Sequence, residues 1–256
     1  MKNYEITPSF YVSEEYFKKY LGQTSYYLKL QDVTEKIIRL THAQNVLELG
    51  SALGTTVGKF AAEFKTVHFT GVDIREDVVE QAKKTFSGLD NLEFKAADMC
   101  DYVKDSISDT DLIYLLYSFH HIEDPLERKV EFLETCHKNM KKGSFLFIIE
   151  SFLPGPDSSA GDIDRLYEKR ALEGYASTYW NSLNSIDEEG LALSKKVASV
   201  SFSEESKAGE MVVKRDTEYL VDFDWLVKAC EDAGFEVVIA EPVNCICENA
   251  VLLRRR

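Results

Sequence analysis

Apolar runs alternate with amphipathic segments through the middle of the chain. Short, mostly apolar runs are typical of buried strands, and segments whose apolar residues return every three or four positions are typical of helices. We predict strands at residues 45–49, 67–73, 91–97, 111–117 and 144–151, and helices at residues 55–64, 75–86 and 124–140. This alternation predicts a mostly parallel sheet with helices on both faces, the doubly wound α/β arrangement.

Residues 1–44 precede this pattern and are rich in tyrosine. Helical spacing of apolar residues predicts two helices, around residues 13–20 and 25–40. We expect them to form an N-terminal helical cap over the cofactor pocket. The tyrosines could contact a ligand or pack the cap onto the sheet, and for any single tyrosine packing is the favoured interpretation.

The alternation stops at residues 152–221, which we expect to be an insertion after the fifth strand. It opens with a Pro- and Gly-rich turn, and two helices and a polar, mobile loop follow in the order 162–175, 187–200 and 203–209. The aromatic residues after the first of these helices either line a substrate pocket or form a small separate core; they are Tyr175, Tyr179 and Trp180. A helix at 222–233 and two strands at 235–240 and 250–253 close the chain.

A glycine loop follows the first strand, in the pattern Glu48-x-Gly50-x-Ala52-x-Gly54. Glycine lets the backbone turn sharply and approach a ligand closely at the start of a helix. The dinucleotide fingerprint would need glycine at 50, 52 and 55, but the chain has Ala52 and Thr55 there. A nicotinamide cofactor therefore fits this loop poorly.

Acidic residues stand at the ends of the second and third strands. Asp73 could accept hydrogen bonds from two neighbouring ribose hydroxyls. Asp98 could accept from an adenine amino group while Met99 packs on the ring. Both acids could instead cap the helices that follow, but their joint placement favours ligand contact. In an open parallel sheet, ligands bind beyond the carboxyl ends of the strands, where these residues fall.

This order of motifs resembles the class I S-adenosylmethionine-dependent methyltransferases, whose first motif is acid-x-Gly-x-Gly-x-Gly. The segment Phe119–Pro125, FHHIEDP, looks like the fourth motif of the small-molecule branch. The resemblance covers roughly residues 40–150, and it implies a Rossmann-like, seven-stranded sheet closed by a terminal hairpin. It also implies S-adenosylmethionine as cofactor, S-adenosylhomocysteine as product and cofactor contacts at Glu48, Gly50, Ser51, Gly54, Asp73, Ile74, Asp98, Met99 and Tyr117.

His120 and His121 follow the fourth strand, where substrate should meet the methyl group. Either histidine could act as a general base, because imidazole titrates near neutral pH. Alternatively, one histidine fixes the loop and the other is buried. The catechol-type branch of the family holds magnesium with an Asp-Asn pair near this motif, whereas this chain has Ser118 to His121, so we expect no metal.

Charge and composition limit the classes of partner that we expect for this protein. The 256-residue chain is 45% hydrophobic and carries a formal charge of −14, which disfavours a nucleic-acid partner. It shows no long apolar run and no signal-peptide core at its start, so we expect a soluble, cytoplasmic protein without membrane contact. The five cysteines are expected to be reduced thiols, and Cys245 and Cys247 have no partner motif for zinc.

We therefore predict a methyltransferase domain over residues 45–256 that methylates oxygen, nitrogen or an activated carbon of a small molecule. A protein methyltransferase is the alternative within the fold, which an acidic groove and a basic peptide substrate would favour. The alternative from another functional class is a protein that keeps the fold but serves as a scaffold or has a non-methylating role, because Ala52 departs from the motif. A homodimer paired through cap helices is compatible with the sequence.

Overall fold

The computed structural model describes residues 25–123, 126–153, 162, 165, 203–207, 210–215, 218–243 and 248–256. Its elements are α2 (Ser25–Thr41), β1 (Asn45–Leu49), α3 (Thr55–Glu63), β2 (His68–Asp73), α4 (Glu76–Thr85), β3 (Leu92–Ala96), α5 (Met99–Asp105), β4 (Leu112–Leu116), the 3₁₀ turn η3 (Phe119–His121), α6 (Glu127–Asn139), β5 (Phe145–Ser151), β6 (Ser203–Lys207), β7 (Glu210–Arg215), β8 (Glu218–Leu220), α9 (Phe223–Asp232), β9 (Phe235–Pro242) and β10 (Glu248–Arg255).

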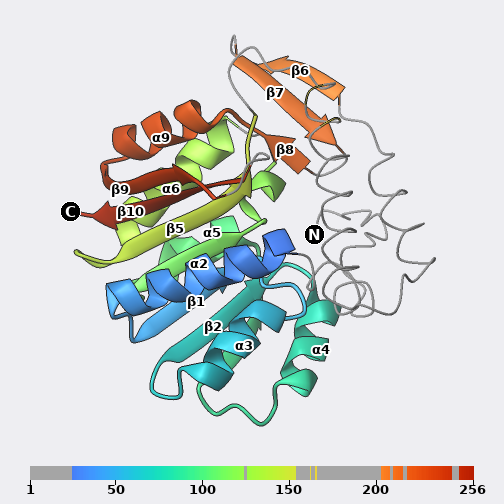
Figure 1. Cartoon of the computed structure of the whole chain (residues 1–256), viewed down its shortest axis with the longest axis vertical. Helices are drawn as coiled ribbons and strands as arrows, with labels where there is room; N and C mark the ends of the chain where they lie inside the picture. The colour runs from blue at the N-terminus through green and yellow to red at the C-terminus, as the bar shows by residue number, and fades with distance from the viewer. Residues whose placement is uncertain are drawn as a thin grey trace.

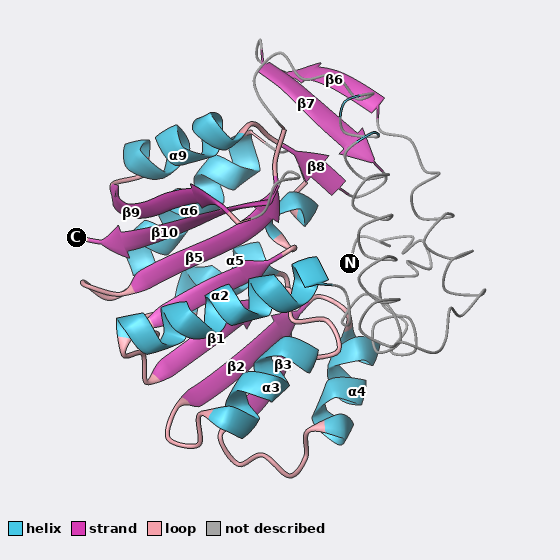
Figure 2. Cartoon of the chain, viewed as in Figure 1, coloured by secondary structure: helices cyan, strands magenta, loops and turns pink. Residues whose placement is uncertain are grey.

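Seven strands form one twisted sheet in the order β3-β2-β1-β4-β5-β10-β9. The first five pair in parallel, and β10 runs antiparallel between β5 and β9 (Figure 2). The predicted fold class, a mostly parallel seven-stranded sheet closed by an antiparallel hairpin, is confirmed. The strand order reverses at β1, because β2 lies on one side of β1 and β4 lies on the other. Doubly wound sheets bind ligands at such a switch point.

Helices cover both faces of the sheet (Figure 1), and an apolar layer of buried side chains lies on each face. Residues that alternate along a strand point to opposite faces, so on β1 Leu47 and Leu49 join one layer and Val46 joins the other. Helices α5, α6 and α9 pack on the first face, and α2, α3 and α4 on the second. Because the central strands are buried on both faces, they appear in the sequence as continuous apolar runs.

The structure corrects one prediction in the insertion. Residues 203–209 were expected to be a polar, mobile loop, but residues 203–207 are strand β6, which pairs antiparallel with β7 in a three-stranded sheet β6-β7-β8. Pairing in a hairpin satisfies the backbone groups whatever the side chains, so polar sequence alone does not exclude a strand. The described part of the insertion is thus mainly β, and the helices predicted at 162–175 and 187–200 lie outside the described residues except for 162 and 165.

At the N-terminal side, α2 confirms the predicted helix at 25–40, and the helix around 13–20 lies outside the described residues. Helix α6 begins at Glu127, and the predicted capping residues Asp124 and Pro125 are likewise not described. In the described part of the chain, no helix combines the length and the apolar character needed to cross a membrane.

Candidate functional site

The carboxyl ends of four neighbouring strands bring the predicted motifs to one edge of the sheet. The glycine loop follows β1, Asp73 ends β2, Asp98 lies beyond β3, and Tyr117 to His121 follow β4. Since β3, β2, β1 and β4 are consecutive in the sheet, these segments lie side by side. The sequence predicted this convergence, and the strand order places the glycine loop between the acids and the histidines.

The glycine loop is fixed by backbone hydrogen bonds and by two positions that need glycine. The amides of Gly50 and Ser51 donate to Val72 O at 2.8 and 2.9 Å. Gly50 has φ +78°, and a Cβ there would lie 2.3 Å from the Cβ of Ser118. Gly54 has φ +72°, and a Cβ there would lie 2.4 Å from the ring of Phe94. Both turning glycines are therefore required by the fold itself.

The departure from the motif also has a positive φ. Ala52, at the central glycine position, has φ +45°, a conformation in which an L side chain is disfavoured by about 1–2 kcal/mol. Its amide donates to Asp73 Oδ2 at 2.8 Å, and this bond helps to hold the strained residue in place. Asp73 thus supports the glycine loop.

We expect Gly54→Ala to lower the free energy of unfolding by about 2 kcal/mol or more, because strain adds to the overlap with Phe94. Ala52→Gly should be neutral or stabilise by up to about 1 kcal/mol, since it removes strain but frees the unfolded chain. Urea unfolding followed by circular dichroism measures both. Gly88→Ala is the matched control, because a Cβ there meets nothing within 4 Å. A Gly54→Ala protein as stable as the wild type would contradict the overlap.

Glu48 lies beneath the loop and is only 4% exposed. Its carboxylate accepts from the amide of Val57 at 3.2 Å, in the first turn of α3. Burial raises the pKa of Glu48 to about 8, against the lowering effect of its hydrogen bonds with Tyr114 and Val57. This acid therefore fastens the start of α3 to β1 from below the loop.

Asp73 uses both carboxylate oxygens at the edge of the sheet. Oδ2 accepts from Ala52 N, and Oδ1 accepts from Arg75 N at 3.0 Å. Burial raises the pKa of Asp73, and the two backbone donors oppose that shift. Each oxygen retains acceptor capacity for a further donor. The next side chain, Ile74, is 50% exposed and offers an apolar surface beside this carboxylate.

Asp98 is the N-cap of α5, a short helix that the sequence pattern did not predict. Its Oδ1 accepts from Cys100 N at 2.7 Å, so the capping interpretation holds for this acid. One carboxylate can cap a helix and still accept from a ligand through its second oxygen. Met99 follows, half-buried, and packs against the core of this face.

Two further predicted site residues are Ser51, within the glycine loop, and Tyr117, which directly follows β4. Ser51 is buried, and its Oγ has no hydrogen-bond partner among the described residues. Tyr117 has φ +54°, and its hydroxyl donates to Glu248 Oε1 at 2.9 Å. Positive φ at a bulky residue is uncommon and typical of functional or strained positions.

The two histidines differ in surroundings. His120 is buried, and its Nδ1 lies 2.7 Å from Glu150 Oε1, while its amide donates to Glu150 Oε2 at 3.1 Å. Because a carboxylate only accepts, Nδ1 of His120 carries the proton. Its Nε2 lies 3.0 Å from Nε2 of His121, whose side chain is exposed. The result is a hydrogen-bonded chain from buried Glu150 through His120 to His121.

Two acids near the histidines and Tyr117, Glu150 and Glu248, were not predicted as site residues from the sequence. Glu150 is 2% exposed, at the carboxyl end of β5, and Glu248 is fully buried at the start of β10. An acid inside the apolar run of β5 was the available signal, because a buried carboxylate needs nearby donors. The two acids lie on neighbouring strands next to the histidine turn and Tyr117.

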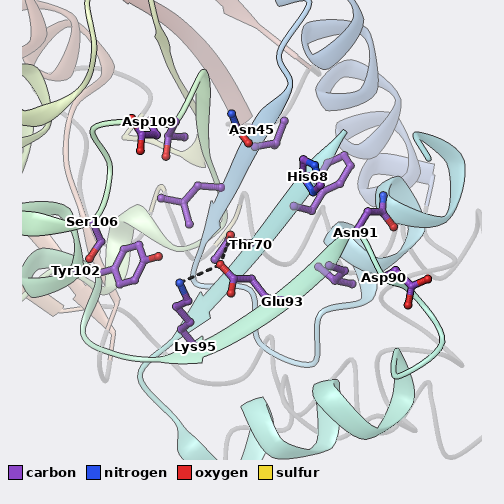
Figure 3. Close-up of a pocket in the computed structure, with 15 residues that line it drawn as sticks. Asn45, His68, Thr70, Asp90, Asn91, Glu93, Lys95, Tyr102, Ser106 and Asp109 are labelled. Atoms are coloured by element: carbon purple, nitrogen blue, oxygen red, sulfur yellow. Dashed lines mark hydrogen bonds and ion pairs between the residues drawn. The ribbon is translucent and has the colours of Figure 1, made fainter. Parts of the chain in front are cut away.

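A polar groove elsewhere on the sheet has a volume of about 440 Å³ (Figure 3). It runs along β1, β2, β3 and α5, and Lys95 and Thr70 both bind Glu93 in it, at 2.9 and 3.1 Å. None of the site residues predicted from the sequence lines it. The residues that line the groove include Asn45 and His68, the first residues of β1 and β2. Much of the groove therefore lies toward the amino ends of these strands, away from the edge that carries the predicted motifs.

Three predicted substrate residues, Tyr175, Tyr179 and Trp180, lie outside the described residues, as do Cys245 and Cys247. In the part of the chain that the structure describes, no group of three His, Cys, Asp or Glu side chains is placed to hold a metal ion.

Residues 46–143 match the family model described as a methyltransferase domain. An uncharacterized curated protein of Rickettsia prowazekii is 28% identical over 112 residues, which make up 43% of this chain and 20% of that protein. The chain thus aligns with only a fifth of that relative's length.

Solved structures share the fold at low identity. A S-adenosylmethionine-dependent methyltransferase from Clostridium acetobutylicum superposes with a TM-score of 0.59 at 14% identity, covering 93% of this chain and 95% of that one. The N-methyltransferase NodS from Bradyrhizobium japonicum, solved with S-adenosylhomocysteine, superposes with a TM-score of 0.56 at 12% identity. The match covers 92% of this chain and 90% of NodS. An O-methyltransferase family protein from Burkholderia thailandensis superposes with a TM-score of 0.58 at 12% identity. The match covers 90% of this chain but only 57% of that protein.

Proposed function

We propose that the protein moves a methyl group from S-adenosylmethionine to oxygen, nitrogen or an activated carbon of a small molecule, and that it does so through residues 46–143, which match the family model described as a methyltransferase domain. The observation that carries the proposal is the convergence of the glycine loop, Asp73, Asp98 and the histidine turn at one edge of the sheet. Ligands of doubly wound sheets bind at such an edge.

The residues at this edge fit the parts of that cofactor. We assign the loop Gly50 to Gly54 to the methionine part and Asp73, with its remaining acceptor capacity, to the ribose hydroxyls. Asp98 and Met99 are assigned to adenine, beside exposed Ile74. Glu48 lies under the loop, so we assign it a supporting role through Val57 in place of direct contact.

When bound, the cofactor supplies an electrophilic methyl group on a sulfonium, which passes in line to a nucleophile. Chain residues must then orient the acceptor, exclude water and take up a proton if the acceptor carries one. We propose His121 as the base, because it is exposed at the end of the hydrogen-bonded chain. His120, buried and bound to Glu150, orients it. An acceptor held beside His121 would give its proton to that imidazole, while its lone pair bonds the methyl carbon and the electron pair of the broken carbon–sulfur bond stays on sulfur, so that S-adenosylhomocysteine leaves.

Substrate selection is proposed to belong to the segments that flank the domain. We assign residues 1–44 to a cap. We assign residues 152–221 to a substrate-side insertion, which supplies Tyr175, Tyr179 and Trp180. The formal charge of −14 favours small-molecule over nucleic-acid substrates.

The test begins with calorimetric titration of the purified protein with S-adenosylmethionine and S-adenosylhomocysteine, for which we expect micromolar dissociation constants. A screen of phenols, amines and activated carbon acids, with detection of S-adenosylhomocysteine, then identifies the acceptor class. Absence of binding to either cofactor form would sink the proposal.

With an acceptor in hand, His121→Ala should lower kcat by about 10²- to 10⁴-fold, since a positioned base is worth that much when the acceptor is protonated. Affinity for S-adenosylhomocysteine should not change. His68→Ala is the matched control, because this exposed histidine begins β2, at the other end of the strand from Asp73. Full turnover by His121→Ala on a protonated acceptor would rule out the base.

A further inference from the structure

A lysine is buried in the layer behind the histidine turn. Lys129, in the first half of α6, is 0% exposed. Taking an ammonium out of water is costly unless several partners replace the water. Burial accordingly lowers the pKa of Lys129 to about 7, and attraction by Glu150 opposes that shift. A cation at this place therefore needs a reason other than stability.

The partners of Lys129 are the two ends of the histidine turn. Its Nζ donates to Phe119 O at 2.8 Å and to Ile122 O at 3.0 Å, so it spans the segment that carries both histidines. The same ammonium lies 4.8 Å from the centroid of the Phe119 ring. Lys129 thus contacts the turn at three points, all of them on Phe119 and Ile122.

Phe119 and Ile122, whose carbonyls accept from Lys129, are themselves buried. Glu150 binds the ring and the amide of His120 in the same turn. The turn is therefore bound by a buried acid and by a buried lysine that attract each other, and these contacts limit rotation of the His120 ring away from His121.

We propose that Lys129 is a positioning residue that fixes the histidine turn, so that the hydrogen-bonded chain from Glu150 through His120 stays aligned with His121. This role rests on the proposed methyl transfer only for its effect on turnover. Its effect on the histidine rings does not depend on any substrate. An apolar residue at position 129 could fill the same core with no charge to bury. The two hydrogen bonds that Lys129 donates to the turn therefore explain the ammonium, and packing does not.

The experiment compares Lys129→Met, Lys129→Arg and the control Lys138→Met, which removes a charge from an exposed position on the same helix. Three properties are measured: thermal unfolding, affinity for S-adenosylhomocysteine, and the ¹⁵N tautomer pattern of the histidine rings, with His120 assigned by loss of its signal in His120→Gln. Turnover is added once an acceptor is known.

We expect Lys129→Met to fold, to bind S-adenosylhomocysteine within about twofold of wild type, and to lower kcat by about 10- to 100-fold, because small misalignments have effects of that size. The His120 pattern should change from the Nδ1-protonated form to an average of both tautomers. Lys129→Arg, which keeps the charge and donors, should restore the pattern at least in part, and Lys138→Met should leave everything unchanged.

An unchanged His120 pattern in a folded Lys129→Met protein would overturn the proposal, as would a loss of turnover that only follows a loss of fold. If Lys129→Met does not fold, the pattern in Lys129→Arg decides: loss of the Nδ1-protonated form despite a retained charge refutes the role, and its retention supports it. Failure of the wild type to bind cofactor would refute methyl transfer but leave the tautomer comparison valid.

Discussion

Replacing Asp73 with alanine is expected to weaken binding of S-adenosylmethionine by about 100-fold or more. The carboxylate is assigned two hydrogen bonds to ribose hydroxyls, and a hydrogen bond to a charged group contributes about 1.5–3 kcal/mol. Its loss also releases the amide of Ala52, whose positive φ then has less to hold it. Calorimetric titration measures the dissociation constant, and thermal unfolding shows whether the variant remains folded.

The matched control for this variant is Asp77→Ala. Asp77 lies four residues further along, at the start of α4, and its side chain is 69% exposed in an ion pair with Arg75. The change in net charge is the same, so long-range electrostatics alone would weaken both variants equally. Equal affinities of Asp73→Ala and wild type would remove the assignment of Asp73 to the cofactor.

Stability is expected to fall as pH rises from about 5 to 8, through Glu48. Its pKa is about 8 in the folded state and near 4.5 in the unfolded state, so over this window the folded protein binds more protons. Rising pH then favours the unfolded state, by up to about 4 kcal/mol. Glu48→Gln, which keeps the shape and cannot ionise, should flatten the slope and be the more stable protein at pH 8.

Urea unfolding at pH 5, 6, 7 and 8 measures this dependence. Burial raises the pKa of Asp73 as well, so a smaller slope of the same sign should remain in Glu48→Gln. Lys129 changes stability with pH in the opposite sense. Above its folded-state pKa of about 7 the unfolded state binds more protons, so this residue makes the free energy of unfolding rise with pH. Glu80→Gln, at an exposed acid, is the control. A wild-type slope that Glu48→Gln leaves intact would contradict the assignment.

Sequence pattern was enough to locate β1 to β5 and the edge of the sheet at which the motifs meet. Strands buried on both faces are continuous apolar runs, and the first three predicted strands end at or just before a glycine or an acid, namely Gly50, Asp73 and Asp98. The two closing strands were also predicted from the sequence, and the family resemblance supported their pairing as a hairpin. Positions such as Asp73 could be assigned to the site edge because they directly follow a strand end, which is a local property.

Features that depend on distant partners could not be predicted in the same way. Glu150 and Lys129 stand 21 residues apart in sequence, and only the packing of α6 against β5 and the turn brings their charges together. The division of roles between the histidines depends on Glu150 for the same reason. Strand β6 was missed because its polar residues pair through the backbone, which leaves no apolar alternation to detect.

The position of β10 has a consequence for synthesis on the ribosome. This strand pairs with β5 along its whole length, from Glu248 with Ser151 to Arg254 with Phe145, although 97 residues separate the first pair in sequence. Until it emerges, β5 has a free edge of backbone donors and acceptors, the kind of surface at which nascent chains associate wrongly. Pairing over so long a separation is also slow. A chain that has completed β1 to β5 therefore leaves this edge open until β10, its last described strand, has been made.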